Sequence, residues 1–592
     1  MPNTKVDTVA PVDGDRYKWT ALSNTTLGIF MATLDSSIVL ISLPAIFRGI
    51  HLDPLQPSNI GFLLWMLMGY LVVTAVLVVT FGRLGDIFGR VRMYNAGFAV
   101  FTLASIALSL TPGHGASAAL FLIGFRIIQG VGGALLMANS TAILVDAFPL
   151  EQRGMAMGVN MIAGIAGSFI GLVLGGILAD INWRLVFWVN VPFGAFGTIW
   201  AYAKLREVGS RTAAKLDWLG NVTFAAGLVS ILVGITYGIQ PSGGHTMGWT
   251  SPSVLAELIG GVALLLAFCV IETRVTDPMF HVDLFRIREF AAGNLASLLS
   301  SIGRGGLQFM LIIWLQGIWL PLHGYSFERT PLWAGIYMLP LTAGFLIAGP
   351  ASGWLSDRYG AKFFATAGMV GAALSFGLLM TLPANFGYAA FALLLLLNGI
   401  SMGLFAAPNT TAIMNAVPAR QRGAASGMRA TFQNSGMVLS IGLFFSLMIA
   451  GLAHELPGTL SAGLTSHGVP AATAERIAHE PPVGSLFAAF LGYNPIKTLV
   501  GNQVLSTLPA KDVATLTGKA FFPSLISKPF LHGLRITFTA SLLLCLIAAA
   551  ASWLRGPRTV PADEEDVGVF GAPTSDGASA SEAPEPEEWV PA

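Results

Sequence analysis

The sequence has little charge for its length. Asp, Glu, Lys and Arg make up 11% of the 592 residues, against roughly a quarter in soluble domains, while apolar residues make up 54%. A water-soluble protein of this length could not cover its surface with so few charges. The net charge is +1, so the charge balance does not point to nucleic acid or to an acidic partner. We therefore expect lipid to be the main solvent of this chain.

Several kinds of chemistry are also missing. The two cysteines, Cys269 and Cys545, lie inside apolar runs and imply no disulfide framework. No histidine falls within a predicted span, so no metal site is expected there. Neither the G-x4-G-K-[ST] phosphate loop of ATP-driven pumps nor the paired-aspartate motif of prenyl-type transferases occurs. These absences argue against a pump and against a membrane enzyme, and we expect no metal and no cofactor.

Apolar stretches of spanning length, about 20 residues each, are abundant. The predicted spans lie at about 21–46, 59–81, 94–112, 118–145, 155–179, 183–203, 216–240, 253–272, 291–319, 331–355, 363–382, 386–415, 424–452 and 533–555. The chain is polar up to about Thr20 and shows no cleavable signal peptide, so the first span is expected to act as the anchor. The sequence thus predicts an all-α integral membrane protein with 14 transmembrane helices.

The distribution of Lys and Arg predicts the orientation. With the N-terminus inside, fifteen of these residues fall in short inner loops, and three (Arg48, Arg184 and Arg329) fall in short outer loops. Both termini are therefore predicted to be cytoplasmic. The long outer connection 453–532 contains apolar clusters such as 487–490 and is expected to form short amphipathic helices on the outer surface. The Pro-, Ala- and acid-rich tail 556–592 is expected to be disordered.

An internal repeat divides the chain into two halves. Gly82-x3-Asp86-x2-Gly89 returns as Gly353-x3-Asp357-x2-Gly360, at an offset of 271 residues. The segments 139–143 and 149–154 return at 409–413 and 418–423, at offsets of 270 and 269. The offset spans eight helices, so two extra helices lie between halves of six. The predicted regions are an N-terminal tail 1–20, a first half 21–203, a linker with two helices 204–290, a second half 291–555 and the tail 556–592.

The motifs resemble those of a known family. Leu34-Asp35-Ser36-Ser37 with Leu43-Pro44 lies in the first span, Gly82 to Arg92 forms a loop motif, and Arg126-Ile127-Ile128-Gln129-Gly130 lies in the fourth span. Later landmarks are Trp183-Arg184…Asn190-Val191-Pro192, Asp217-Trp218-Leu219-Gly220 and Asp283-Leu284-Phe285-Arg286. In this order they resemble the major facilitator superfamily, specifically its fourteen-helix drug:proton antiporter group, over most of residues 20–450. The resemblance implies two six-helix halves that alternate access to a central cavity.

One carboxylate is predicted to lie deep in the membrane. Asp35 is near the middle of the first span, where a charge is costly. Burial disfavours its ionised form and a nearby cation favours it, so Asp35 can take up and release a proton. Arg126 is its expected partner, and by resemblance the pair couples proton movement to transport. The alternative is a structural ion pair, or an arginine that contacts backbone carbonyls.

Further polar residues are candidates for the substrate cavity. They are Gln129, which follows Arg126 in the fourth span, and Arg304 in the span 291–319. Arg304 would influence which substrate charge is accepted. Arg429 is a further buried cation, placed close enough to the inner surface to reach it.

The repeated loop is predicted to form an inner gate. Gly82 and Gly89 permit a tight turn and close helix packing. By resemblance Asp86, Arg90 and Asp146 form a charge cluster that latches this gate, and Asp357 has a weaker role in the second half. The alternative is a loop whose arginines only mark topology.

A glycine stripe runs along the fifth span. Gly167, Gly171, Gly175 and Gly176 have the small-residue spacing that lets helix backbones approach in lipid, and a gating role is implied by the family alone. The antiporter motif has a Gly-Pro pair here, whereas Gly171 is followed by Leu172. Symport or facilitated diffusion therefore remains open beside antiport.

The sequence thus predicts a transporter, not an enzyme: a secondary active transporter that exports hydrophobic or amphiphilic small molecules, such as drugs or lipid-like compounds, in exchange for protons. It is expected to be a monomer in the plasma or inner membrane, in contact with lipid and not with nucleic acid. A symporter or facilitator of the same fold, or a membrane sensor or scaffold without transport, is the alternative.

Overall fold

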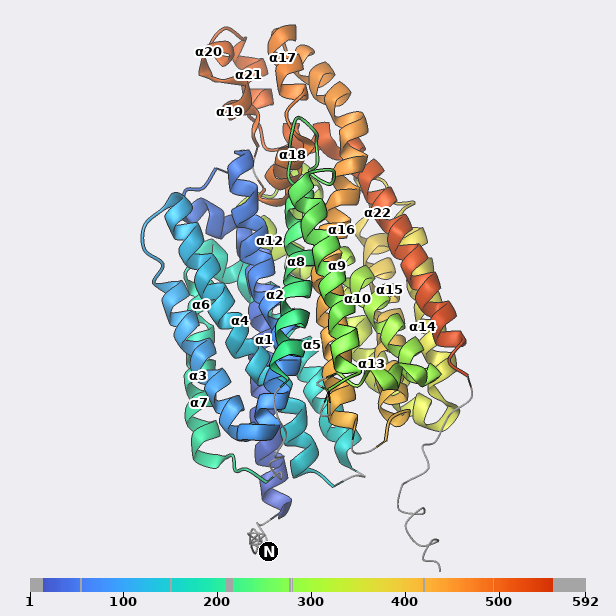
Figure 1. The fold of residues 1–592 in the computed structure, drawn as a ribbon. Coiled ribbons are helices and arrows are strands. Elements are labelled where there is room, and N and C mark those ends of the chain that lie inside the picture. Colours follow the sequence, from blue (N-terminus) through green and yellow to red (C-terminus); the bar gives the residue numbers. More distant parts are fainter. Residues whose placement is uncertain are drawn as a thin grey trace, which may run out of the picture.

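The computed structural model describes residues 14–53, 56–149, 152–208, 217–275, 278, 280–418, 421–492 and 494–556. Within these residues the chain is helical, and fourteen segments are long and apolar enough to cross a membrane. They run nearly parallel in one bundle (Figure 1). We call the end at which the first helix begins the lower face, and the end that carries the long connection the upper face. The predicted disordered tail lies outside the described residues except for Gly556.

The first half contributes six spans. Its helices are α1 (Gly14–Gly49), α2 (Pro57–Phe88), α3 (Arg90–Ser109), α4 (Gly115–Ala147), α5 (Arg153–Ile181), and α6 (Leu185–Trp188) with α7 (Asn190–Lys204). The last two form one span interrupted at Val189. Helix α1 begins within the predicted tail 1–20 because the Tyr17 hydroxyl donates to the Arg206 carbonyl at 2.6 Å, which fixes its first turn.

Two extra helices lie between the halves. They are α8 (Trp218–Gly238) and α9 (Pro252–Glu272), which pack against each other. Helix α8 also contacts α2 of the first half and α16 (Arg422–Thr465) of the second. The extra pair therefore lies against the seam between the halves.

The second half repeats the packing of the first. After the short turn η2 (Val282–Arg286), its helices are α10 (Arg288–Trp314) continued by the π-helix η3 (Leu315–Trp319) and α11 (Leu320–Leu322), α12 (Thr330–Tyr337) with α13 (Leu339–Tyr359), α14 (Ala361–Leu379), α15 (Tyr388–Asn415), α16, and α22 (Phe521–Trp553). Contacts of α2 with α4, α3 with α4 and α1 with α5 recur as α13 with α15, α14 with α15 and α10 with α16. The fold is therefore the predicted pair of six-helix halves with two inserted helices.

The connection predicted at 453–532 is shorter than expected. Helix α16 continues to Thr465 and α22 already begins at Phe521, so His454 and His532 lie in helices. The reason is a buried leucine stripe, in which Leu452, Leu456 and Leu460 follow one another at helical spacing and are at most 2% exposed. This stripe keeps the helix continuous past Pro457.

The expected surface position of the apolar cluster 487–490 is wrong. Five short helices fill the upper connection: α17 (Ala471–Ala478), α18 (Pro482–Phe490), α19 (Ile496–Val500), α20 (Asn502–Leu505) and α21 (Ala510–Leu516). Helix α18 is buried, and it contacts α2 of the first half as well as α10, α16 and η3 of the second. A Cβ on Gly317 would lie 2.5 Å from the Ala489 carbonyl oxygen, so this glycine lets η3 meet α18. Lacking a polar face, α18 packs in the protein interior below the other short helices (Figure 1).

The two halves touch closely on the upper side. A Cβ on Gly176 of α5 would collide with the backbone of Leu332 in α12, and a Cβ on Gly335 would lie 2.9 Å from the Leu172 carbonyl oxygen. Leu172 is the residue that stands where the antiporter motif has proline. Glycines thus form this contact from both halves.

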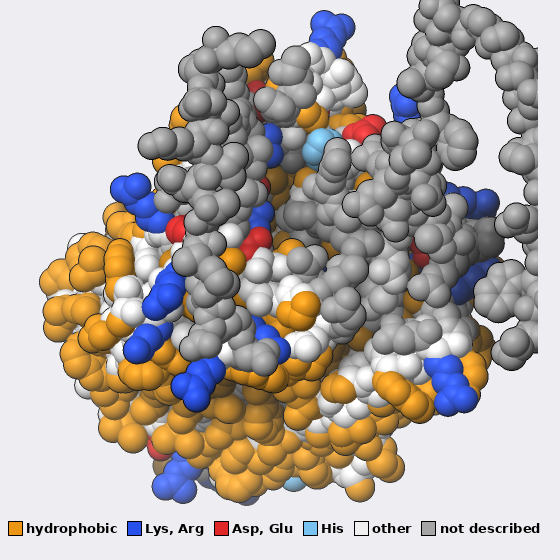
Figure 2. Space-filling view, turned by 90° about the horizontal axis from the view of Figure 1, so that it is seen from below, with side chains coloured by type: hydrophobic (Ala, Val, Ile, Leu, Met, Phe, Trp, Pro, Cys, Tyr) orange, Lys and Arg blue, Asp and Glu red, His pale blue; other side chains and the backbone are white. Residues whose placement is uncertain are grey.

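The lower face carries basic side chains. Figure 2 shows Lys and Arg side chains spread over this face, with hydrophobic side chains around them. We predict that this face is cytoplasmic. In a chain with alanine at Cys269 and Cys545, Ser242→Cys and Ser466→Cys on the upper face should react with an impermeant thiol reagent in intact cells. Lys204→Cys, which is also exposed, should react only after permeabilisation. Reaction of Lys204→Cys in intact cells would reverse the orientation.

The α5–α12 contact predicts a position-specific effect within one helix. Gly176→Val should separate the halves on the upper side, lower transport and destabilise the protein by about 1–3 kcal/mol through overpacking. Gly158→Val is the matched control, because a Cβ at Gly158 of the same helix meets no neighbour within 4 Å. The measurement is thermal unfolding of the purified protein together with transport. Equal behaviour of the two variants would contradict the close contact.

Candidate functional site

Asp35 lies in the middle of the first half and is fully buried. Its Oδ1 accepts hydrogen bonds from Gln129 Nε2 at 2.9 Å and from Asn190 Nδ2 at 2.7 Å. Its Oδ2 accepts from Arg126 Nη1 in an ion pair. Donors from α4 and α7 therefore surround a carboxylate on α1, which is the condition for keeping a charge in a membrane interior.

Arg126 joins this network to the rest of the half. Its Nη1 also donates to Gln129 Oε1 at 2.7 Å, and its guanidinium carbon lies 4.6 Å from the centre of the Tyr70 ring. The ring face attracts the cation and helps to hold it in place. Its Nε has no partner among the described residues. Arg126 is thus held by an anion and an aromatic ring and still has one donor unused.

The glycines of the arginine motif explain how Tyr70 reaches this position. A Cβ on Gly130 would lie 3.0 Å from the Tyr70 carbonyl oxygen, and one on Gly133 would lie 2.6 Å from the Tyr70 hydroxyl. Arg126 and Gln129 are three residues apart and therefore share one face of α4. The spacing of the motif thus builds the site directly.

Gln129 does not line the cavity in this structure. It is fully buried, and its Nε2 also donates to Ser105 Oγ at 2.9 Å. Asn190, which follows the helix interruption at Val189, takes a direct place beside Asp35 that the sequence analysis did not assign. A polar side chain inside an apolar span, just before Pro192, was the available signal.

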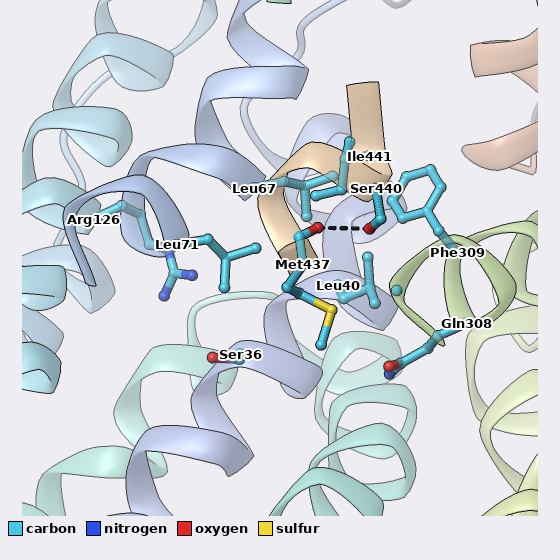
Figure 3. Close-up of a pocket in the computed structure, with 11 residues that line it drawn as sticks. Ser36, Leu40, Leu67, Leu71, Arg126, Gln308, Phe309, Met437, Ser440 and Ile441 are labelled. Carbon is cyan, nitrogen blue, oxygen red and sulfur yellow. Dashed lines mark hydrogen bonds between the residues drawn. The ribbon is translucent and has the colours of Figure 1, made fainter. Parts of the chain in front are cut away.

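A cavity lies between the two halves beside this network. The empty space in and around it, open solvent included, is about 460 Å³, and the volume open to the centres of water-sized molecules is about 60 Å³. It is lined by Ser36, Leu40, Leu67, Leu71, Arg126, Gly305, Gln308, Phe309, Met437, Ser440 and Ile441. Arg126 lies at one side of it and Gln308 at the opposite side (Figure 3). Arg126 is therefore the residue that belongs both to the carboxylate network and to the cavity wall.

Arg304 lies one turn before Gln308 on α10. Part of its surface is accessible, and no carboxylate in the described part of the chain acts on it. Arg429 on α16 donates to Gln433 Oε1 at 3.0 Å and likewise has no acidic neighbour in the described structure. These cations differ from Arg126, which has Asp35.

The predicted charge cluster forms at the lower face. Arg90 Nε donates to Asp86 Oδ1 at 2.9 Å, and Arg90 Nη1 lies 2.6 Å from Asp146 Oδ1. The three residues come from the end of α2, the start of α3 and the end of α4, all within the first half. Here the cluster joins helices of one half and does not bridge the halves.

Gly89 has a conformational reason to be glycine. Its φ is 110°, in the region where a side chain is strained. A Cβ there would also collide with the carboxylate of Glu207, which accepts from the Arg92 backbone N–H at 2.9 Å at the start of α3. Gly82 has more room, because its nearest neighbour would be 4.0 Å away, at Ala138.

The second half has a related arrangement at its lower end. Gly360 has a φ of 89° between α13 and α14, as Gly89 has between α2 and α3. The side chain of Asp357 lies outside the described residues. Arg555, which follows α22, donates to Asn409 Oδ1, and burial lowers the pKa of its guanidinium to about 10. Asn409 is the repeat counterpart of Asn139.

The glycine stripe of α5 packs against α1. A Cβ at Gly167, Gly171 or Gly175 would lie within 2.5–2.9 Å of a backbone carbonyl oxygen of α1. Gly176 meets α12 of the other half instead. Helix α5 thus contacts the Asp35 helix on one side and the second half on another.

No group of three or more His, Cys, Asp or Glu side chains suited to a metal ion occurs within the described residues. The candidate site consists of the buried network around Asp35, a cavity with apolar and polar walls, and the arginines Arg304 and Arg429.

Comparison with known proteins agrees with this architecture. The sequence model of the Major Facilitator Superfamily matches residues 25–441. The tetracenomycin C resistance and export protein of Streptomyces glaucescens is 27% identical over 95% of this chain and 96% of its own length. The multidrug resistance protein Stp of Mycobacterium tuberculosis is 28% identical over 92% and 93%. The riboflavin transporter RibZ of Clostridioides difficile is 27% identical over 74% and 90%.

Solved structures share the fold at low sequence identity. A bacterial homologue of the human lysosomal transporter Spinster, in an inward-facing and unoccupied conformation, superposes with a TM-score of 0.54 at 16% identity, over 91% of this chain and 97% of that one. The fold, the match over most of the bundle and the relatives together show that this chain is a transporter of the major facilitator superfamily and not an enzyme.

Proposed function

We propose that this protein exports hydrophobic or amphiphilic small molecules in exchange for protons by alternating access. The observation that carries the proposal is the position of Arg126, which binds the buried carboxylate of Asp35 and also lines the cavity. A change in the charge of Asp35 therefore alters the ion pair of a residue in the cavity wall. The names of the relatives that export tetracenomycin C or confer multidrug resistance support the direction of transport.

The coupling follows from the hydrogen bonds of Asp35. When ionised, the carboxylate accepts three donors and ties α4 and α7 to α1. When protonated, it loses its charge and one oxygen becomes a donor, which weakens its bond to Arg126. Arg126 is then free to turn toward the cavity. Helix α1 can move with α5, which packs on it through glycines and contacts α12 of the other half.

The cavity wall supports an apolar or amphiphilic substrate. Leu40, Leu67, Leu71, Phe309 and Ile441 supply apolar surface, and few polar groups interrupt it. The protein works in this proposal as a monomer in the plasma membrane, with the lower face and both termini in the cytoplasm.

The alternatives use the same fold in other ways. A symporter or facilitator would use the same network with the opposite direction or no coupling, and the missing proline at Leu172 leaves this open. A sensor or scaffold would bind without transport. Uphill export driven by a pH gradient is the property that separates our proposal from both.

Asp35→Asn is the decisive variant, because asparagine has nearly the same size and cannot ionise. In proteoliposomes with an imposed pH gradient, uphill export should fall to the passive leak, while exchange of substrate without a gradient should persist. Asp512→Asn, at a partly exposed position of α21 far from Asp35 in the sequence, is the control and should keep wild-type export. Uphill export by Asp35→Asn at the wild-type rate would refute the proposed role of Asp35.

The lower charge cluster is proposed to hold the ends of α2, α3 and α4 together while the halves move. Arg90→Gln leaves two partly buried carboxylates without their shared cation, so it should destabilise the protein by about 1–3 kcal/mol and reduce transport. Arg92→Gln, with an exposed side chain two residues later, should do neither. Thermal unfolding and transport measure both effects, and equal stability of the two variants would count against the proposed role.

A further inference from the structure

Two half-buried arginines of the second half have no carboxylate partner among the described residues. Asp35 neutralises Arg126, whereas Arg304 and Arg429 have no ion pair and no acidic neighbour in the part of the chain that the structure describes. An uncompensated cation inside a membrane protein is costly and marks a functional site. The two arginines thus leave uncompensated positive charge on the second half.

Arg304 borders accessible space. Its side chain makes no hydrogen bond among the described residues. The Nε atoms of Arg126 and Arg429 are buried without a hydrogen-bond partner, whereas no nitrogen of Arg304 is buried in this way. Gln308, one turn further along α10, lines the cavity (Figure 3). The neighbouring Gly305 also lines it, whereas Arg304 itself is not among the lining residues. Arg304 is thus a partly accessible arginine, without an ion pair among the described residues, one helical turn from a residue of the cavity wall.

The residues around Arg304 on α10 are glycines that let α16 pack closely against this turn. Gly303, Gly305 and Gly306 surround it, and side chains at the last two would collide with Ser440 and Phe444 of α16. Arg304 is thus the one long side chain on this turn of α10, at the level where α10 and α16 meet.

Arg429 provides a second positive charge nearer the lower face. It precedes Ser440, which meets Gly305, by eleven residues of α16, or about 16 Å at the helical rise of 1.5 Å. The second half therefore has one cation within a helical turn of the cavity wall and another on the side from which a cytoplasmic substrate would enter.

We propose that the substrate carries an acidic group, such as a carboxylate, sulfonate, phosphate or ionised phenol, on an apolar body. Arg304 binds the acidic group, and the apolar body contacts the leucines and Phe309. This substrate class rests on the proposed export function, but the anion site itself can be tested by binding alone. Arg429 attracts the anion toward the cavity.

Binding is tested with two dyes that share a xanthene core, anionic fluorescein and cationic rhodamine 123. The full-length protein is placed in neutral phosphatidylcholine nanodiscs, so that anionic lipid does not occupy the site. Fluorescence anisotropy should show tighter binding of fluorescein than of rhodamine 123. Arg304→Gln should weaken fluorescein binding about tenfold or more, the effect of losing a charge-assisted hydrogen bond. Arg304→Lys should retain part of the affinity.

The control is Arg288→Gln, an exposed arginine at the start of the same helix, which should bind fluorescein like the wild type. The dye comparison on the wild-type protein does not depend on the folding of any variant. Equal or tighter binding of rhodamine 123, or unchanged fluorescein binding by Arg304→Gln, would overturn the anion site.

Transport separates this inference from the proposed function. Fluorescein export driven by a pH gradient should fall in Arg304→Gln. Fluorescein bound through Arg304 but not exported by the wild type would refute proton-coupled export and leave the anion site standing. Uphill export of fluorescein that is the same in Arg304→Gln would refute the anion site and leave the export function standing.

Discussion

A carboxylate in the middle of a membrane-spanning bundle costs about 3 kcal/mol or more unless donors surround it. Asp35 meets this requirement with donors from two other helices, so its ionised form is tied to the relative positions of α1, α4 and α7. The hydrogen bonds that stabilise the ionised carboxylate also hold the three helices together, so protonation of Asp35 weakens the contacts between them. Protonation of Asp35 removes the negative charge that holds the side chains of Arg126 and Asn190 in place.

Glycine packing allows a local change of this kind to move a whole half. Helix α5 lies against α1 through Gly167, Gly171 and Gly175, and it meets α12 of the second half at Gly176. Because these helices touch through their backbones, there are few flexible side chains between them to absorb a shift. A displacement of α1 can therefore pass through α5 to the other half on the upper side, where α18 also contacts both halves.

Much of the architecture could be predicted because its causes are local. Hydrophobic length gave the spans, the repeat offset gave the halves, and the spacing of Arg126 and Gln129 put both on one helix face. The position of α18 could not be predicted, because lipid and protein interior are equally apolar and composition does not distinguish them. The extension of α16 was missed because Pro457, His454 and Glu455 are typical of a loop, and packing of the leucine stripe outweighs that local preference.

The site shows the same limit. The pairing of Asp35 with Arg126 follows from burial and the need for a counter-charge, so it was predictable. The part played by Asn190 depends on a contact across 155 residues and on the interruption between α6 and α7. Gln129 was expected in the cavity but binds Asp35 instead. The sequence does not show whether a polar side chain of a buried helix faces the cavity or a neighbouring carboxylate.

The central claim is that Asp35 exchanges a proton as substrate binds, and proton counting tests it most directly. Purified protein in weakly buffered detergent solution is mixed with a transported substrate, and the pH change is followed with an indicator dye. The account predicts a proton signal from the wild type that is absent in Asp35→Asn. A signal of the same size from Asp35→Asn would contradict it and place the exchanged proton on another group.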